Sequence, residues 1–143
     1  MGAADDQEYV AFLRDNGLQV TYQRLAIFKT LLNSTNHPTT EEIYQQVRKT
    51  FPMISLGTVY KTLEKFLEKG VVKRVHAFGD TARYEIPAEP HHHMICVKCR
   101  SMLDISDPIT QEDLSLPEGH GFQVLGHNVL VMGYCPGCHG TNN

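Results

Sequence analysis

The stretch P-H-H-H-M-I-C-V-K-C-R, Pro90 to Arg100, places three histidines and two cysteines within nine consecutive residues. Chance rarely produces such a density of metal-ligand residues, so we take the chain to be organised around metal. Cys96 and Cys99 form a C-x-x-C pair that lets two thiolates reach one ion, and Cys135 and Cys138 repeat this spacing. Four soft thiolates fill the tetrahedral shell of zinc and leave no position open for chemistry. The sequence therefore predicts a structural zinc site on these four cysteines.

Two disulfides are the alternative use of four cysteines. The chain begins with polar and acidic residues from Met1 to Gln7, and no signal peptide precedes them. This start favours a reducing cytoplasm, where disulfides are rare. No stretch of the sequence is apolar for long enough to span a membrane. We therefore expect zinc rather than disulfides, and a cytoplasmic protein.

The histidines indicate a second metal site of different chemistry. If residues 90–97 are extended, His91 and His93 point to one side of the strand and His92 to the other. Asp104, within the apolar run Met102 to Ile105, could supply an oxygen ligand from a neighbouring strand. Such a mixed site suits Fe(II), Mn(II) or Zn(II), and a carboxylate favours the harder ions. A solvated polar turn is the alternative, but three histidines beside a C-x-x-C pair favour a ligand role.

Composition and charge are those of a soluble globular protein of one or two small domains. The chain has 143 residues, of which 41% are hydrophobic and 20% are charged, and its net charge is −3. Met1 to His76 holds ten Lys and Arg against eight Asp and Glu, whereas Ala77 to Asn143 holds three against eight. A slightly basic first half thus precedes an acidic second half that is rich in metal ligands.

Helical patterns occupy the first half of the chain. Val10 and Leu13 fit a short first helix that ends near Gly17, and Thr21 begins a second helix. The inward-facing residues of this second helix are expected to be Leu25, Phe28, Leu31 and Leu32. A third helix follows, with a capping box at Thr39 and Glu42 and an inward face of Ile43, Tyr44 and Val47.

A fourth helix and a hairpin complete this half. Ser55 caps the helix, Gly70 ends it, and its buried stripe is Leu56, Val59, Leu63, Phe66 and Leu67. Strands follow at Val71 to Val75 and Ala82 to Ile86, with a turn over Phe78 to Thr81. This order is typical of a winged helix, in which Leu56 to Lys69 would enter the DNA major groove. A small helical bundle with a solvated lysine face is the alternative.

The second half predicts a small α/β domain. Strands are expected at His93 to Val97, Met102 to Ile105 and Phe122 to Gly133, with a helical stretch at Ile109 to Leu116. Fewer than seventy residues make a thin core, so we expect zinc to hold it together and a second subunit to cover it. The predicted α+β chain thus has a winged-helix DNA-binding domain (1–86), a hinge (87–90) and a zinc-stapled dimerisation domain (91–143).

Several motifs now occur in one order: G-L-Q-V-T-Y-Q-R at Gly17 to Arg24, H-P-T-T-E-E-I-Y at His37 to Tyr44, and I-S-L-G-T-V-Y-K-T-L at Ile54 to Leu63. They continue with H-H-H-M-I-C-V-K-C at His91 to Cys99 and end in G-Y-C-P-G-C at Gly133 to Cys138. Over nearly its whole length the chain resembles the ferric uptake regulator (Fur) family. The resemblance implies a homodimeric, metal-dependent transcriptional repressor that binds operator DNA through an N-terminal winged helix and dimerises through a C-terminal α/β domain.

The resemblance also assigns roles to individual residues. The family's regulatory metal site corresponds to His37, Glu85, His91, His93 and Asp104, and its structural zinc to the four cysteines. Its base-reading tyrosine corresponds to Tyr60, and the basic residue that approaches the minor groove corresponds to Arg14. Ser55, Thr58 and Lys61, on the reading helix and its cap, are further expected DNA contacts.

Asp104 bears on the type of signal, because iron-uptake regulators usually carry Glu at this position and peroxide-sensing repressors (the PerR type) carry Asp. Glu85, by contrast, stands where peroxide sensors commonly carry Asp. Our leading hypothesis is a peroxide-responsive repressor that binds DNA with Fe(II) or Mn(II) and is released when bound iron reacts with peroxide. By resemblance, the oxidation-prone ligands are His37 and His91. The alternative is an iron-sensing repressor of iron uptake genes.

A catalytic zinc site and an additional Fur-type metal site are not expected. A zinc hydrolase, our remote alternative, needs a metal with an open position and a nearby general base. The chain has no H-E-x-x-H motif, and Glu89 is the only spare carboxylate near the ligand cluster, so we expect no enzyme. Some Fur proteins have an additional metal site, but His92, His127 and Gln111 or Glu112 supply only part of it. We do not expect that site to be filled.

Overall fold

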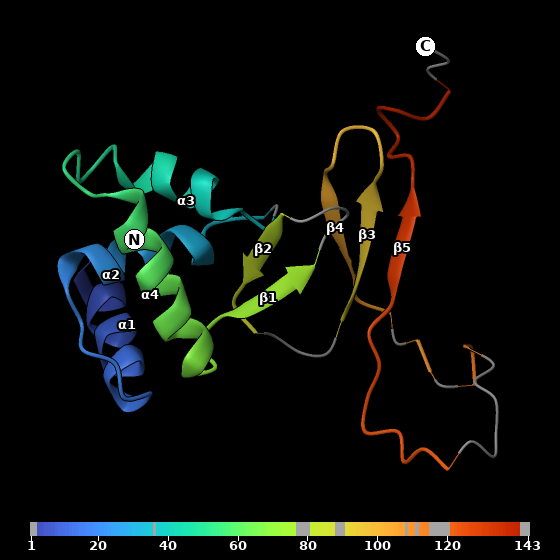
Figure 1. The fold of residues 1–143 in the computed structure, drawn as a ribbon, viewed down its shortest axis with the longest axis horizontal. Helices are drawn as coiled ribbons and strands as arrows, with labels where there is room; N and C mark the ends of the chain where they lie inside the picture. The colour runs from blue at the N-terminus through green and yellow to red at the C-terminus, as the bar shows by residue number, and fades with distance from the viewer. Residues whose placement is uncertain are drawn as a thin grey trace. The chain divides into compact units, whose positions relative to one another are not determined.

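The chain folds into two compact units, Met1–Pro87 and Ala88–Asn143, coloured from blue to green and from yellow to red in Figure 1. The structure is a computed structural model that describes residues 3–35, 37–76, 81–87, 91–107, 109–110, 112–114 and 121–140. The expected hinge extends over residues 87–90, of which 88–90 lie outside the described residues. The expected turn at 78–81 is described only at Thr81.

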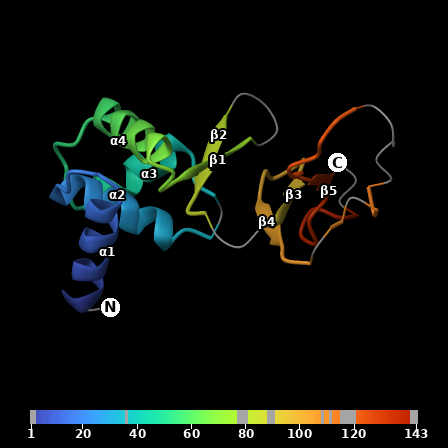
Figure 2. The same cartoon turned by 90° about the horizontal axis from the view of Figure 1, so that it is seen from below.

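The first unit consists of four helices followed by a two-stranded antiparallel hairpin (Figures 1 and 2). The elements are α1 (Ala3–Asp15), α2 (Tyr22–Leu32), α3 (Thr40–Val47), α4 (Leu56–Glu68), β1 (Lys73–His76) and β2 (Ala82–Glu85). The predicted winged-helix order is confirmed. α1 is longer than the short helix that the apolar spacing suggested, because its polar first turns carry no inward-facing signal.

Local hydrogen bonds explain why these helices begin and end where they do. Thr21 caps α2 by accepting a hydrogen bond from the backbone N–H of Arg24. At α3 both hydrogen bonds of the predicted capping box form, between Thr39 and Glu42. Gly70, with φ of +69°, supplies the left-handed residue that ends α4. Short-range hydrogen bonds therefore fix the bounds of the helices, including α4, the helix expected to read DNA.

The core of the first unit lies where all four helices meet. Phe28 of α2 contacts Phe66 of α4 edge to face, with ring centroids 6.2 Å apart. The remaining buried members come from every helix, from the segments that flank the helices and from β2: Leu13, Leu18, Ile27, Leu31, Ile43, Val47, Ile54, Val59, Leu63, Val71, Val72 and Tyr84. The expected inward face of α2 was partly wrong, because Ile27 is fully buried whereas Leu32 is exposed. Leu25, Tyr44 and Leu67 pack at the edge of this core.

The second unit is a three-stranded sheet with the order β4–β3–β5. β3 (His92–Cys96) pairs antiparallel with β4 (Met102–Ile105) and parallel with β5 (Leu130–Gly133). The expected strand at Phe122 to Gly133 was wrong in length, because only its last four residues are a strand. Residues 122–129 are apolar in part but lack regular structure, and Phe122 and Leu125 are 87% and 91% exposed. Apolar composition alone does not supply the partner that a strand needs.

The expected helix at Ile109 to Leu116 is described only in part. Residues 112–114 form a turn, and Asp113 accepts hydrogen bonds from the backbone N–H and the hydroxyl of Thr110. Residues 108, 111 and 115–120 lie outside the described residues, as do Pro117 and Gly119, which were expected to end the helix.

The buried core of the second unit is thin. Among its described hydrophobic residues only Ile95, Cys96 and Met102 are buried. A larger set of apolar side chains on the sheet and just after it is exposed, comprising Met94, Leu103, Leu130, Val131, Met132 and Tyr134. So little buried apolar surface does not stabilise a sheet of this size alone. In the described part of the chain, every helix is too short or too polar to cross a lipid bilayer.

Candidate metal centres and DNA-binding surface

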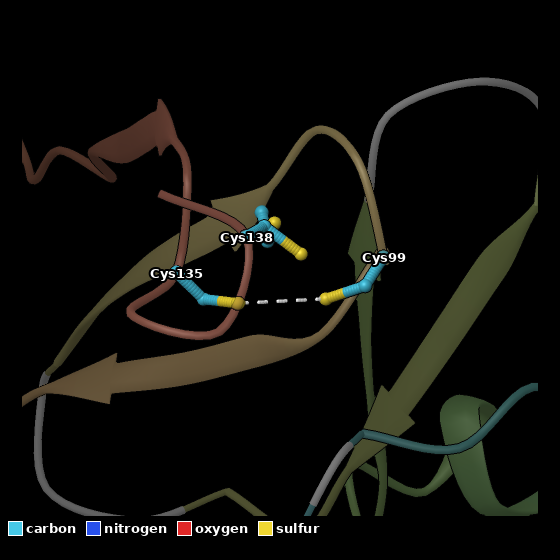
Figure 3. A group of neighbouring side chains, drawn as sticks. Cys99, Cys135 and Cys138 are labelled. Atoms are coloured by element: carbon cyan, nitrogen blue, oxygen red, sulfur yellow. Dashed lines mark hydrogen bonds between the residues drawn. The ribbon is translucent and has the colours of Figure 1, made fainter. Parts of the chain in front are cut away.

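The parallel pairing of β3 with β5 brings the two C-x-x-C pairs together. Cys96 is the last residue of β3 and lies opposite Gly133 of β5, so Cys99 and Cys135 follow from neighbouring strand ends. Arg100, with φ of +66°, closes the turn that contains the first pair, because its N–H donates to the Cys96 carbonyl. The backbone N–H of Cys138 donates to the carbonyl of Cys135 at 2.9 Å and closes the second turn. Figure 3 shows the side chains of Cys99, Cys135 and Cys138 pointing toward one another.

The sulfur positions match a zinc site better than a disulfide pair. All four sulfurs lie within 4.8 Å of one another, and the four cysteines are present as thiols. A tetrahedron with Zn–S distances of about 2.3 Å has S···S edges of about 3.8 Å, whereas a disulfide needs about 2.05 Å. Cys99 Sγ and Cys135 Sγ are 3.7 Å apart. The donor set therefore fits a tetrahedral Zn²⁺ ion.

The pKa values of the cysteine thiols differ, and a bound cation would remove this difference. Hydrogen bonds from the backbone at Cys135 and Cys99 lower the pKa of Cys96 to about 6. A side-chain hydrogen bond with Cys135, together with burial, raises the pKa of Cys138 to about 12. Of these two thiols, Cys96 therefore becomes a thiolate more readily than Cys138. A bound divalent cation replaces those protons, because only the thiolate is a ligand.

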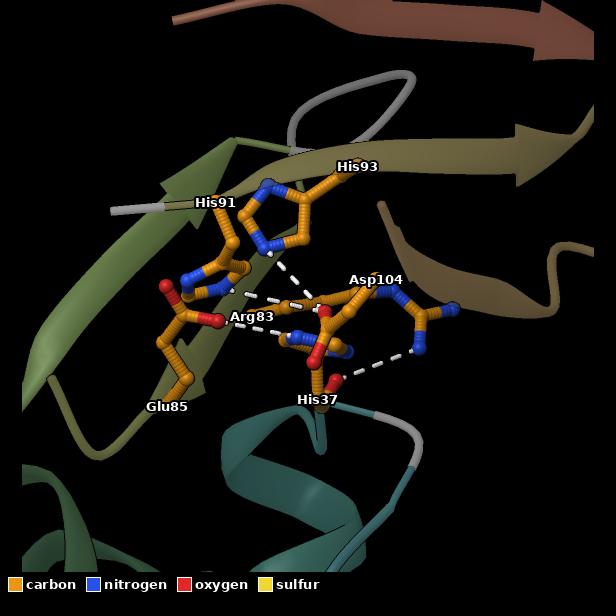
Figure 4. A network of polar contacts seen from close by, with 6 residues as sticks. All are labelled: His37, Arg83, Glu85, His91, His93 and Asp104. Atoms are coloured by element: carbon orange, nitrogen blue, oxygen red, sulfur yellow. Dashed lines mark hydrogen bonds and ion pairs between the residues drawn. The ribbon is translucent and has the colours of Figure 1, made fainter. Parts of the chain in front are cut away.

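The first unit contributes a buried pair of metal-ligand types. His37 Nε2 lies 2.9 Å from Glu85 Oε2, and the two side chains are only 6% and 8% exposed. Figure 4 shows this contact between the histidine, which precedes α3, and the carboxylate at the end of β2. One nitrogen and one oxygen make too few ligands for an ion, so the pair is half of a site at most.

His37 is held in an unusual backbone conformation. Its φ is +51°, in the left-handed region that non-glycine residues occupy at a cost of about 1 to 3 kcal/mol. The guanidinium of Arg83 on β2 donates to the His37 carbonyl at 3.2 Å, and the Tyr84 N–H donates to the Pro38 carbonyl at 3.1 Å. β2 therefore carries Glu85 and also fixes the segment that presents His37. A strained residue held in this way is a common property of functional sites.

The second unit contributes three more donors, at the start of β3 and on β4. His93 and Asp104 are partners in the antiparallel register, and His91 and His93 lie on the same side of the strand, as predicted. Both Nε2 atoms approach one oxygen: Asp104 Oδ1 is 3.7 Å from His91 and 3.5 Å from His93. Figure 4 shows the two imidazoles turned toward this carboxylate. Ligands on one ion at about 2.1 Å are themselves about 3 to 3.5 Å apart, so this trio fits a mixed nitrogen and oxygen site.

His92 points away from this trio and contacts His127 instead. Their rings stack with centroids 5.4 Å apart. His92 Nδ1 accepts a hydrogen bond from the Val129 N–H, and His127 Nε2 contacts the Ile109 carbonyl. Glu112 is exposed, and Gln111 lies outside the described residues. In the part of the chain that the structure describes, no group of three metal-ligand side chains includes these histidines.

The expected DNA contacts lie on two helices of the first unit. Ser55 caps α4 and bonds to Thr58, and both Tyr60 and Lys61 are exposed on the first two turns of that helix. Arg14 is exposed in the last turn of α1. Because Ser55 and Thr58 bond to each other, part of their hydrogen-bonding capacity is already used in capping the helix.

Sequence analysis did not predict that Tyr60 has a partner on α3. Its hydroxyl donates a hydrogen bond of 3.0 Å to Glu41 Oε1, and this bond raises the pKa of Tyr60 above its usual value. Nineteen residues separate the pair, so no local pattern could have revealed it. The only available signal was the position of Glu41 in the first turn of α3, beside the capping box.

Comparison with known proteins identifies the family of this arrangement. The model of the ferric uptake regulator family matches residues 15–132. The peroxide-responsive repressor PerR of Staphylococcus epidermidis is 35% identical over 138 residues, which are 96% of this chain and 92% of that protein. The ferric uptake regulator of Vibrio cholerae is similar in structure, with a TM-score of 0.74 and 30% identity over 88% of this chain and 98% of that one. PerR from Streptococcus pyogenes matches with a TM-score of 0.52 and 29% identity, over 93% of this chain and 92% of that one.

Proposed function

We propose that this chain, which belongs to the ferric uptake regulator family, is a metal-dependent repressor that binds operator DNA as a cytoplasmic homodimer and releases it in response to peroxide. The winged-helix unit and the two metal-ligand sets of different chemistry support this function. Members of this family are transcriptional regulators, so the hypothesis of a zinc hydrolase is set aside. The exposed apolar side chains around β5 are the surface that a second subunit would cover.

The single observation that carries the proposal is the convergence of His91 and His93 on one oxygen of Asp104. These three donors leave a divalent ion incompletely ligated, and the buried pair of His37 and Glu85 would supply the two donors that are missing. We propose that one Fe²⁺ or Mn²⁺ ion takes all five side chains as ligands. Zinc would occupy the four cysteines, where thiolates alone are the donors.

A shared ion of this kind would couple metal binding to DNA binding. Two ligands belong to the unit that carries α4, and three belong to the unit expected to dimerise. Fixing one unit to the other sets the spacing of the two recognition helices in a dimer, and spacing decides whether both reach successive major grooves. A coupling free energy of about 1 to 3 kcal/mol changes operator affinity roughly 5- to 150-fold.

The choice between peroxide and iron as the signal depends on the ligands themselves. Asp104 favours peroxide sensing by the resemblance, and the staphylococcal relative is a peroxide-responsive repressor. The chemistry that ferrous iron supplies when bound is the reduction of peroxide to an oxidant beside its ligands. His37 and His91 are the imidazoles that we expect to accept oxygen. Glu85 and the similarity to an iron regulator keep iron sensing as the second candidate.

Metal titration of single-ligand variants tests the shared site. His37→Ala removes a donor from the first unit, and His93→Ala removes one from the second. If one ion binds both histidines, each substitution lowers the affinity for Mn²⁺ at the same site. Zinc content stays at one equivalent per chain. His139→Ala, an exposed histidine beside Cys138, is the matched control and leaves both metals in place. A His37→Ala protein that binds Mn²⁺ as tightly as the unmodified chain would refute the shared ion.

A further inference from the structure

The hydrogen bond between Tyr60 and Glu41 connects the helix expected to read DNA with the helix packed before it. Tyr60 lies in the second turn of α4 and is 42% exposed, and Glu41 is exposed in the first turn of α3. Their side chains meet at 3.0 Å on the surface of the first unit. The N-terminal residues of a recognition helix are those that contact base edges, so this pair occupies the part of the surface that selects sequence.

The direction of the bond follows from the charge of the carboxylate. An ionised carboxylate only accepts hydrogen bonds, so the phenol is the donor. A tyrosine phenol is protonated at neutral pH, and the hydrogen bond to Glu41 raises the pKa of Tyr60 further. The phenol has one hydrogen, and it is donated in the hydrogen bond to Glu41. The lone pairs of the Tyr60 oxygen are then the only hydrogen-bonding capacity left for another molecule.

An oxygen that can only accept distinguishes the bases of the major groove. Adenine and cytosine present amino donors there, whereas guanine and thymine present oxygen acceptors at the corresponding positions. We propose that Glu41 is a specificity-determining residue that acts through Tyr60: by holding the phenol hydrogen, it makes Tyr60 select adenine or cytosine over guanine or thymine at one operator position. This inference rests on the proposed function, because it requires α4 to be the helix that reads the operator.

The position of an acid at this surface supports a role in selection rather than in affinity. A carboxylate close to DNA phosphates weakens binding by repulsion, which basic residues such as Lys61 must offset. Glu41 lies in the first turn of α3, where the helix dipole favours a negative charge. Direct contact of Glu41 with a cytosine amino group is the competing explanation, since carboxylates also accept from that group.

Selection from a random duplex library tests the inference. The Mn²⁺-loaded full chain is allowed to enrich duplexes with a random core, and the enriched sequences are compared for the unmodified protein, Glu41→Ala, Tyr60→Phe and the double variant. The unmodified protein should prefer adenine or cytosine at one position by roughly tenfold, the effect of one hydrogen bond at an interface. Both single variants should lose that preference at the same position, and the double variant should show no further change.

Glu64→Ala is the matched control, because it removes an exposed acid from α4, the helix that carries Tyr60, and should leave the enriched sequence unchanged. A preference that survives Glu41→Ala but not Tyr60→Phe overturns the inference. So does a preference for guanine or thymine at the position that Tyr60 reads, or a Glu41→Ala effect that persists in the Tyr60→Phe background. If the unmodified protein enriches no sequence with Mn²⁺, the proposed function itself fails. Circular dichroism melting curves confirm that each variant is folded.

Discussion

His93 and Asp104 face each other across the antiparallel pair of β3 and β4, with His93 Nε2 3.5 Å from Asp104 Oδ1. Backbone hydrogen bonds hold the two strands, so the donors are positioned before any ion arrives. One more methylene at position 104 would push the carboxylate toward the imidazoles. The identity of this acid therefore affects how closely the oxygen and nitrogen donors surround an ion.

Asp104→Glu should keep metal-dependent operator binding but reduce oxidation of the ligand histidines by peroxide. The longer side chain still offers a carboxylate oxygen, yet it changes the positions of the donors around the ion and restores the residue that iron sensors usually carry. Gel shift with Mn²⁺ measures operator binding, and mass spectrometry of the Fe²⁺ form after peroxide measures oxidation. Asp107→Glu, at an exposed acid just after β4, is the control. Unchanged oxidation in Asp104→Glu would contradict a role for the length of this side chain.

Cys138→Ser should remove zinc and unfold or monomerise the second unit. Its buried core is thin, and metal binding of about 10 kcal/mol or more is folding free energy in small zinc domains. Metal analysis and size-exclusion chromatography check the result. The same loss is expected for Cys96→Ser, Cys99→Ser and Cys135→Ser, because each leaves an incomplete tetrahedron. A zinc-free variant that stays dimeric, with the melting curve of the unmodified chain, would contradict the structural role.

Tyr60→Ala and Lys61→Ala should both weaken operator binding and leave metal content and oligomeric state unchanged. Tyr60→Ala should mainly reduce the sequence preference of the protein. Lys61→Ala should reduce the salt dependence of binding by the equivalent of about one phosphate contact. Gel shifts at several salt concentrations separate the two effects. Lys65→Ala, toward the C-terminal end of α4, is the control for general loss of charge. Unchanged affinity in both variants would remove α4 as the reading helix.

Two glycines of the first unit should respond to alanine in opposite directions. Gly70 has φ of +69°, so a Cβ there strains the backbone and Gly70→Ala should cost about 1 to 2 kcal/mol of unfolding free energy. Gly57 lies within α4, where a Cβ meets only Ser55 Oγ at 3.8 Å, and Gly57→Ala should stabilise by about 0.4 to 1 kcal/mol. Denaturant unfolding followed by far-UV circular dichroism measures both. Equal effects of the two substitutions would contradict the assigned backbone conformations.

Sequence patterns predicted the first unit well because its signals are local. The cap at Thr21, the capping box at Thr39 and the stop at Gly70 each depend on residues within four positions. The second unit was harder, because its strands are defined by pairing. β5 is a strand only where β3 lies beside it, and residues 122–129, although apolar in part, are not a strand.

The candidate sites divide in the same way. Alternation along one strand placed His91 and His93 on a common side, and a short apolar run located Asp104. His37 and Glu85, in contrast, were assigned through the family resemblance alone. Their contact depends on β2 binding the segment before α3 across forty-six residues, as the bond from Arg83 to the His37 carbonyl shows. Glu41 was missed as the partner of Tyr60 for the same reason.

Peroxide treatment of the Fe²⁺-loaded protein, with tryptic peptides read by mass spectrometry, tests the central claim most directly. The peptides that contain His37 or His91 should each be able to gain one oxygen at low peroxide, and operator binding should be lost with the same time course. The Mn²⁺-loaded protein should stay unmodified and bound under the same treatment, and the zinc-binding cysteines should be unchanged in both. If the Fe²⁺ protein keeps both histidines intact and remains on the operator, peroxide sensing is wrong and iron sensing takes its place.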